Sequence, residues 1–145
     1  MKVYFDTSVL VAASVAAHPH NAPAAIALQS ARAKRINGHI SGHGMLEFFA
    51  VLTRTPLVPP IYPSEAWQLL ARNILPFFEV TTLSAKDYQE VVHGCAEQGW
   101  IGGRIYDALH LKCARKVDCD RIYTFNVRHF QQLAPDLESR ISSPH

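Results

Sequence analysis

The chain has 145 residues, of which 48% are hydrophobic and 18% charged, and its formal net charge is +2. This length and balance fit one globular domain over residues 1–145 and exclude a disordered chain, while the mild positive charge permits an anionic partner without requiring one. An odd number of cysteines without a CxxC pair argues against a disulfide framework. No stretch approaches the roughly 20 apolar residues of a membrane span. From these two features we expect a cytoplasmic protein.

The chain opens with a strand followed at once by a helix. Val3 to Phe5 is a short β-prone run, and Asp6-Thr7-Ser8 directly after it consists of residue types that cap helices. A strand is therefore predicted to end at Asp6, with a helix beginning just after it. The apolar stretch Val9 to Ala17 faintly resembles a secretory signal, but it is short and Asp6 interrupts the approach to it, so we expect part of the fold here.

The next segments predict a helix, a strand and a second helix. A loop from His18 to Ala22 precedes a helix that runs to about Arg35. Ile36 to Ser41 is a weaker strand candidate. Met45 to Arg54 is predicted to be a helix, and it is strongly apolar except at Glu47.

A loop or hinge is predicted over Thr55 to Ser64, which carries four prolines. Helices and strands alternate after it: a helix over about Glu65 to Leu75, a strand over Phe77 to Thr82, a helix capped by Ser84 that ends near Gly99, a helix from Gly102-Gly103 to about Lys116, a strand over Arg121 to Phe125, a short helix over Val127 to Leu133 and an edge strand over Leu137 to Ile141. This alternation predicts an α/β fold with a mostly parallel sheet covered on both faces, and therefore three layers.

Three of the twelve acidic residues lie in apolar surroundings. Asp6 stands between two apolar runs, Glu47 lies in Met-Leu-Glu-Phe-Phe, and Asp107 lies in Ile-Tyr-Asp-Ala-Leu. A carboxylate in such surroundings is costly unless a salt bridge, backbone donors, protonation or a metal compensates it. Each of these acids taken alone fits a structural role as well as a functional one.

The positions of these acids predict a shared cleft. Ligands of open parallel sheets bind beyond the carboxyl ends of the strands, at the point where the strand order reverses. Asp6 ends the first strand, and Asn126 follows a later one. If Glu47 and Asp107 reach the same place from their helices, three carboxylates and a carboxamide meet there. Such oxygen ligands suit Mg²⁺, which retains waters and accepts phosphate oxygens.

Four segments resemble, in their order, the motifs of the PIN-domain ribonucleases, in particular the VapC-type toxins of bacterial toxin–antitoxin pairs. They are Val3 to Leu10, Met45 to Phe48, Ile105 to His110 and Tyr123 to Phe130. The third is the most specific match, and the resemblance covers the chain from Lys2 to about Phe130. It implies a single three-layer α/β/α PIN-like domain with a central, mostly parallel sheet.

The resemblance implies a metal-dependent endoribonuclease that hydrolyses RNA phosphodiester bonds with Mg²⁺ or Mn²⁺. Asp6 and Asp107 are then expected to be the metal ligands, and Glu47 to act directly or through a water. Many members of the family carry a fourth acid at or near the position of Asn126. An amide still ligates through its oxygen but brings no charge, so we expect one tightly held ion and a second that arrives with the phosphate.

Neighbouring residues are expected to support this site. Three hydroxyl residues are predicted to orient ligands or metal-bound waters: Thr7, Ser8 and Thr124. Arg104, one turn before Asp107, either neutralises phosphate charge or is a solvated helix residue. His110 is interpreted as a packing residue in preference to a substrate contact, and His129 is left open between the two roles.

The resemblance also implies the partners, which are an RNA substrate, a cognate antitoxin protein and a second copy of the chain in a homodimer, without a membrane. Two alternatives stay open: a PIN nuclease that acts in RNA processing or on DNA without a toxin role, and a degenerate module that binds RNA or protein without cutting. The basic clusters in Arg32–Arg35 and Lys112–Lys116 fit either an RNA backbone or the C-terminal ends of helices. The RNA target itself is not predicted.

Overall fold

The computed structural model describes residues 1–145 and contains one five-stranded sheet. Its strands are all parallel and lie in the order β3-β2-β1-β4-β5. They are β1 (Lys2–Phe5), β2 (Asn37–Ser41), β3 (Phe78–Thr81), β4 (Arg121–Tyr123) and β5 (Ile141–Ser142). The predicted mostly parallel α/β sheet is thus confirmed, with no antiparallel strand.

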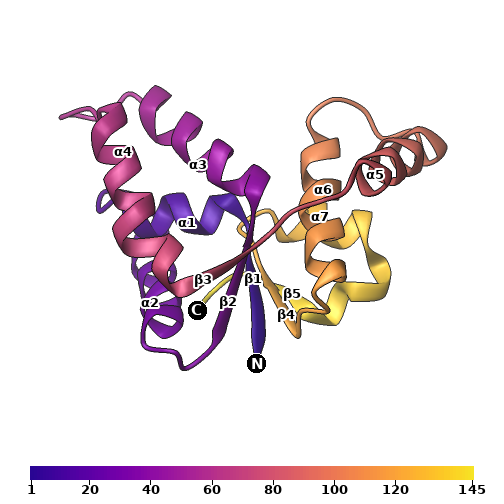
Figure 1. Cartoon of the computed structure of the whole chain (residues 1–145), viewed down its shortest axis with the longest axis horizontal. Coiled ribbons are helices and arrows are strands. Elements are labelled where there is room, and N and C mark those ends of the chain that lie inside the picture. Colours follow the sequence, from indigo (N-terminus) through magenta and orange to yellow (C-terminus); the bar gives the residue numbers. More distant parts are fainter.

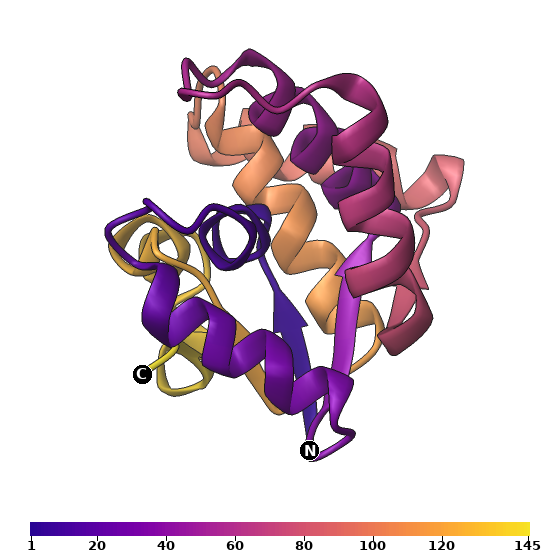
Figure 2. The same cartoon turned by 90° about the vertical axis from the view of Figure 1, so that its left-hand side faces the viewer.

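Helices cover both faces of this sheet, so the three predicted layers are present (Figure 1). Helices α1 to α4 lie on one side of the sheet and α5 to α7 on the other; Figure 2 looks from the side of α1 to α4. They are α1 (Thr7–Ser14), α2 (Asn21–Arg32), α3 (Gly42–Arg54), α4 (Pro63–Leu69), α5 (Ala85–Gln98), α6 (Arg104–Lys116) and α7 (Val127–Leu133). None of them is long and apolar enough to cross a membrane.

The central strand β1 divides the core into two halves. Val3 and Phe5 belong to a cluster of 16 buried residues, whereas Tyr4 between them belongs to a cluster of 11 on the other face. Because side chains of a strand alternate between the two faces, a parallel strand under two helical layers is apolar on both sides. This explains why Val3 to Phe5 is an uninterrupted apolar run.

Local capping decides where several helices begin and end. The Ser84 hydroxyl accepts a hydrogen bond from the Asp87 amide at 3.1 Å, which confirms the predicted capping box of α5. That helix ends at Gly99, whose φ of 72° is left-handed. Helix α3 begins at Gly42, earlier than predicted, because the Ser41 hydroxyl accepts the Gly44 amide at 2.8 Å and caps it.

Two predicted elements differ from the structure. Residues 137–141 were expected to form an edge strand, but Pro135–Arg140 is a 3₁₀-helix and only Ile141–Ser142 pairs with β4. Proline sets the first turn of that helix because its φ is fixed and it needs no hydrogen-bond partner for an amide. The helix expected over residues 65–75 is α4 followed by a π-helical turn, Leu70–Ile74.

The strand order reverses between β1 and β4. From β1 the chain builds outward through β2 to β3, and it then returns to β4 on the other side of β1. The register pairs Phe5 with Tyr123, so the residues that follow them, Asp6 and Thr124, leave the sheet side by side. This is the place where ligands of open parallel sheets bind.

Candidate active site

A cleft of about 320 Å³ lies at the carboxyl ends of β1 and β4. Its walls come from the junction of β1 with α1, from α3 and α6, and from the segment between β4 and α7. It is lined by Asp6, Thr7, Ser8, Val11, His18, Glu47, Val51, Asp107, Phe125 and Asn126. The four residues proposed for chemistry from the sequence, namely Asp6, Glu47, Asp107 and Asn126, therefore meet in one cleft.

Asp6 is held by hydroxyl groups. Its carboxylate is 4% exposed, and Oδ2 accepts hydrogen bonds from Ser8 Oγ and Thr124 Oγ1, both at 2.8 Å. Ser8 Oγ also accepts the Phe125 amide at 3.1 Å, which ties the start of α1 to the end of β4. Two of the three hydroxyl residues predicted to support the site thus orient its most buried acid.

Glu47 is held from two sides through one oxygen. Its Oε1 accepts hydrogen bonds from Thr7 Oγ1 at 2.8 Å and from His110 Nε2 at 2.6 Å. Burial alone would raise the pKa of Glu47, but these donors and the charge of His110 together lower it below its ordinary value. Glu47 is therefore ionised at neutral pH, although it lies among apolar neighbours.

Asp107 is the least compensated acid of the cleft. Its half-buried carboxylate makes no hydrogen bond within the chain. Burial raises its pKa to about 6, and the negative charge of Asp6 adds to the rise, while His110 and His129 act against it. Asn126 also lines the cleft and is exposed, and its side-chain amide does not cap α7, so that amide is free to bind a ligand.

This donor set fits a hard divalent cation. No three His, Cys, Asp or Glu side chains already stand together as a preformed metal cluster. Zinc-type sites need such a cluster, but Mg²⁺ and Mn²⁺ take one or two carboxylates directly and fill the remaining positions with water and phosphate oxygens. Asp6 and Asp107 line the same cleft and could supply those carboxylates, and a positive charge there would oppose the burial and the repulsion from Asp6 that raise the pKa of Asp107.

Comparison with known proteins assigns the fold to a family. The sequence matches the profile of the PIN domain over residues 3–134. This chain belongs to the PIN domain family. Its fold is similar to that of VapC20 from Mycobacterium tuberculosis, described as a toxin that cleaves the sarcin–ricin loop, with a TM-score of 0.69, 16% identity, and coverage of 88% of this chain and 92% of that one.

The PIN fold is shared with a second solved structure, VapBC2 from Rickettsia felis bound to a DNA fragment from its promoter. That comparison gives a TM-score of 0.68 and 19% identity, and it covers 100% of both chains. Among curated proteins, none matches the sequence. At these identities the structural likeness establishes the fold, and the resemblance to VapC-type PIN domains drawn from the four motifs is confirmed at that level.

His110 is the site residue whose role the sequence analysis missed. Its ring is 2% exposed, and besides Glu47 it contacts the Tyr4 hydroxyl, 2.6 Å from Nδ1, and lies 3.4 Å from Asp6 Oδ1. Burial acts to lower the pKa of His110, but the charges of Asp6 and Glu47 raise it overall. The available signal was its place one turn after Asp107, on the same helical face.

Arg104 does not line the cleft of this PIN domain. Its guanidinium donates a hydrogen bond to the Gln132 side chain on α7 at 2.7 Å. The structure therefore favours the second of the two sequence interpretations, a partly exposed helix residue, over a phosphate contact. His18 does line the cleft, and His20 beside it stacks on Phe125 with ring centroids 4.5 Å apart.

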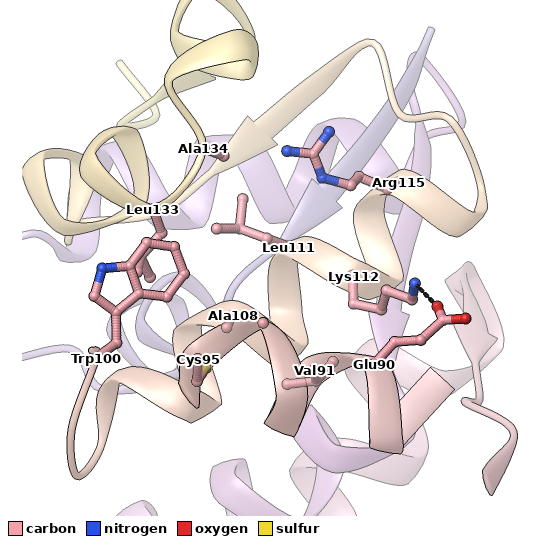
Figure 3. Close-up of a pocket in the computed structure, with 11 residues that line it drawn as sticks. Glu90, Val91, Cys95, Trp100, Ala108, Leu111, Lys112, Arg115, Leu133 and Ala134 are labelled. Carbon is pink, nitrogen blue, oxygen red and sulfur yellow. Dashed lines mark hydrogen bonds and ion pairs between the residues drawn. The ribbon is translucent and has the colours of Figure 1, made fainter. Parts of the chain in front are cut away.

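A second hollow, of about 220 Å³, lies between α5, α6 and α7 (Figure 3). Its walls are mainly apolar and include Trp100 and Leu111, as the close-up shows. Its one acidic side chain, Glu90, is already paired with Lys112. This hollow offers no free carboxylate for a metal, so the candidate active site is the carboxylate cleft at the switch point.

Proposed function

We propose that this PIN domain is a metal-dependent endoribonuclease and the toxin of a type II toxin–antitoxin pair. The observation that carries the proposal is the meeting of Asp6, Glu47, Asp107 and Asn126 in one cleft at the switch point of the sheet. Membership of the PIN family supports nuclease chemistry, and one of the similar solved structures, VapC20, is described as a toxin that cleaves the sarcin–ricin loop, while VapBC2 is described as bound to a fragment of its promoter.

The residues of the cleft divide the work of phosphodiester hydrolysis. Asp6 and Asp107 would hold Mg²⁺ or Mn²⁺, and Asn126 would offer its amide oxygen. A bound divalent ion lowers the pKa of a coordinated water and polarises the phosphate. Glu47, ionised and fixed by two donors, is placed to orient the attacking water. Water adds across the P–O3′ bond and leaves a 3′-hydroxyl and a 5′-phosphate.

The uncharged amide of Asn126 limits the charge of the site. With three carboxylates in the cleft, one divalent ion would be held tightly, and a second would be expected only with the phosphate of the substrate. Ser8 and Thr124 keep Asp6 in place through their hydroxyl groups. The partners that follow from the proposal are an RNA substrate, a cognate antitoxin and a second copy of the chain, in the cytoplasm.

The direct test is cleavage of total cellular RNA by the purified protein with and without Mn²⁺ or Mg²⁺. We expect discrete metal-dependent fragments from the native protein and a loss of at least about 100-fold in the Asp6→Ala, Asp107→Ala double variant. The matched control is Glu97→Ala, Glu138→Ala, which removes the same charge at two exposed positions away from the cleft and should cut normally.

The other outcomes separate the alternatives. Cleavage that persists in the Asp6→Ala, Asp107→Ala variant would contradict the proposed site. Metal-dependent cleavage of DNA in place of RNA would change the substrate class. An absence of cleavage, together with an absence of growth inhibition when the protein is expressed without an antitoxin, would indicate a binding module that does not cut.

A further inference from the structure

A chain of buried hydrogen bonds runs from the core to the cleft. The Tyr4 hydroxyl lies 2.6 Å from His110 Nδ1, and His110 Nε2 lies 2.6 Å from Glu47 Oε1. Tyr4 is 0% exposed and His110 is 2% exposed, so their contact is shielded from water, whereas the Glu47 end of the chain is 29% exposed and reaches the cleft. The chain links the central strand β1 to α6 and then to α3, three elements far apart in the sequence.

The ring of His110 has little freedom in this position. Tyr4 holds it at Nδ1 and Glu47 at Nε2, and on its carbon side α3 approaches closely at Gly44. A Cβ at Gly44 would lie 3.6 Å from His110 Cε1 and 3.1 Å from Ser41 Oγ. The distance to the His110 ring is an ordinary van der Waals contact, so α3 packs against the ring there, and the tighter contact at Gly44 is with Ser41.

The two donors to Glu47 converge on the same oxygen. His110 Nε2 and Thr7 Oγ1 both bind Oε1, while Oε2 makes no hydrogen bond and lies 3.5 Å from His43 Nε2. A glutamate has three rotatable side-chain bonds and loses much conformational entropy when it is fixed. Two charge-assisted hydrogen bonds on one oxygen offset that loss, and they leave the other oxygen with no hydrogen bond, its nearest cation being His43.

We propose that His110 is a positioning residue that fixes the carboxylate of Glu47 in the cleft, and that the Tyr4 hydroxyl holds the His110 ring for this purpose. The inference rests on the proposed nuclease function, since the carboxylate being fixed is the one assigned to the attacking water. His110 does not line the cleft. Its effect on cleavage passes through the carboxylates that it contacts, chiefly Glu47 at 2.6 Å and then Asp6 at 3.4 Å.

The kinetic test compares substitutions that keep or remove the donor at the place of Nε2. In His110→Gln the amide nitrogen can reach Glu47, whereas His110→Leu has no donor. We expect kcat for RNA fragment formation to fall about 10- to 100-fold in His110→Leu, with KM little changed, and the Gln variant to recover most of the loss. Equal and native-like rates in both folded variants would overturn the proposal.

Tyr4→Phe keeps the aromatic ring in the core and removes only the hydroxyl. It therefore tests the hydrogen bond between Tyr4 and His110 without opening a large cavity in the core. Its expected loss is smaller, about threefold to tenfold in kcat. The matched control is Tyr88→Phe, because Tyr88 is 47% exposed on α5 and its hydroxyl makes no hydrogen bond within the chain. A Tyr4→Phe protein that cuts as fast as Tyr88→Phe would contradict a role for the hydroxyl.

A spectroscopic readout does not depend on cleavage. The imidazole nitrogens of His110, observed by ¹H–¹⁵N correlation, should shift at Nδ1 in Tyr4→Phe and at Nε2 in Glu47→Gln. Unchanged nitrogens in both folded variants would show that the chain of hydrogen bonds is absent. If the native protein cuts no nucleic acid while these shifts appear, the nuclease function fails and the hydrogen-bonded arrangement stands. If the native protein cuts RNA but the shifts are absent, the nuclease function stands and the proposed role of His110 fails.

Discussion

At the scale of single residues, the acids of the cleft are not equivalent, because each has different neighbours. Asp6 is bound by two hydroxyl groups, and Glu47 by a histidine and a hydroxyl. Asp107 has no such partner, and burial with the nearby charge of Asp6 raises its pKa to about 6. Ionised Asp107 therefore destabilises the folded protein at neutral pH, and a positive charge in the cleft would reduce that cost.

Replacement of Asp107 by Asn should stabilise the metal-free protein at pH 7.5. The pKa of Asp107 in the folded protein, about 6, lies above its ordinary value of 3.8, so the folded protein binds this proton more tightly than the unfolded chain does. The stability contributed by the protonated carboxyl is therefore lost as the pH rises through about 6. Asn removes the ionisation, so we expect a gain of roughly 1 kcal/mol after allowance for solvent screening, or about 3 °C in Tm.

Thermal unfolding at two pH values and with Mn²⁺ checks this expectation. The advantage of Asp107→Asn should shrink between pH 7.5 and 4.5, where the native carboxyl is largely protonated in the folded state. Mn²⁺ should raise the Tm of the native protein and have little effect on the variant, since a ligand is missing. A variant that is less stable than the native protein at pH 7.5 would contradict this account of Asp107.

At the scale of elements, strand pairing sets the site by setting the register. Phe5 pairs with Tyr123, and the Asp6 amide donates to the Tyr123 carbonyl at 2.9 Å, which brings Asp6 beside Thr124. A shift of one residue would turn every side chain of the strand to the other face. The carboxylate would then leave its hydroxyl partners, so the packing of the sheet and the geometry of the site depend on the same register.

The pairing of β2 with β3 depends on a glycine. Gly38 lies directly opposite Phe78, and a Cβ at Gly38 would come within 2.5 Å of the Phe78 ring, which packs edge-on against Phe5. We expect Gly38→Ala to lower the free energy of unfolding by about 1–3 kcal/mol, because the buried ring must move from its packed position. Denaturant unfolding would measure the loss.

The matched control for this change is Gly94→Ala on α5. No atom lies within 4 Å of a Cβ at Gly94, and the position is inside a helix, where alanine is favoured over glycine by up to about 1 kcal/mol. The same substitution should therefore stabilise the protein at Gly94 and destabilise it at Gly38. Equal signs at the two positions, or a loss at Gly94 with a gain at Gly38, would show that the contact of Gly38 with Phe78 does not govern this edge of the sheet.

At the scale of the whole molecule, exposed ion pairs connect the helices on one side of the sheet. Lys112 pairs with Glu90 and Lys116 with Asp87, which joins α6 to α5. Arg115 binds both carboxylate oxygens of Asp136, in the 3₁₀-helix after α7. These contacts involve the basic cluster Lys112–Lys116, for which the sequence analysis kept two interpretations, binding of an RNA backbone and charges at the C-terminal end of a helix. Its three cations are paired with carboxylates of the protein itself.

The simultaneous change Lys112→Ala, Arg115→Ala, Lys116→Ala should leave RNA cleavage within about twofold of native. Each cation already has a carboxylate partner in the protein, so little net positive charge remains for a phosphate backbone. Exposed ion pairs contribute little to stability, so only a small fall in Tm is expected. A large increase in KM, with a weaker salt dependence of binding, would show instead that this cluster contacts RNA.

The sequence by itself determined the fold class, the order of the elements and the acids of the cleft. Apolar runs separated by capping residues, such as Asp6-Thr7-Ser8 after β1 and Ser84 before α5, are local signals, so they can be read without the fold. An acid in an apolar segment, such as Asp107 or Glu47, is unusual enough to be noticed from its neighbours in the chain.

Only the tertiary structure decided which partner each polar side chain takes. His110, 63 residues from Glu47 and 106 from Tyr4, carries no sign of either contact in its local sequence, and the apolar helix around it favoured a packing role. Arg104 turned out to bind Gln132, which lies 28 residues away. Hydrogen bonds between distant elements depend on how the helices cross the sheet, and that arrangement follows from the packing of the whole core.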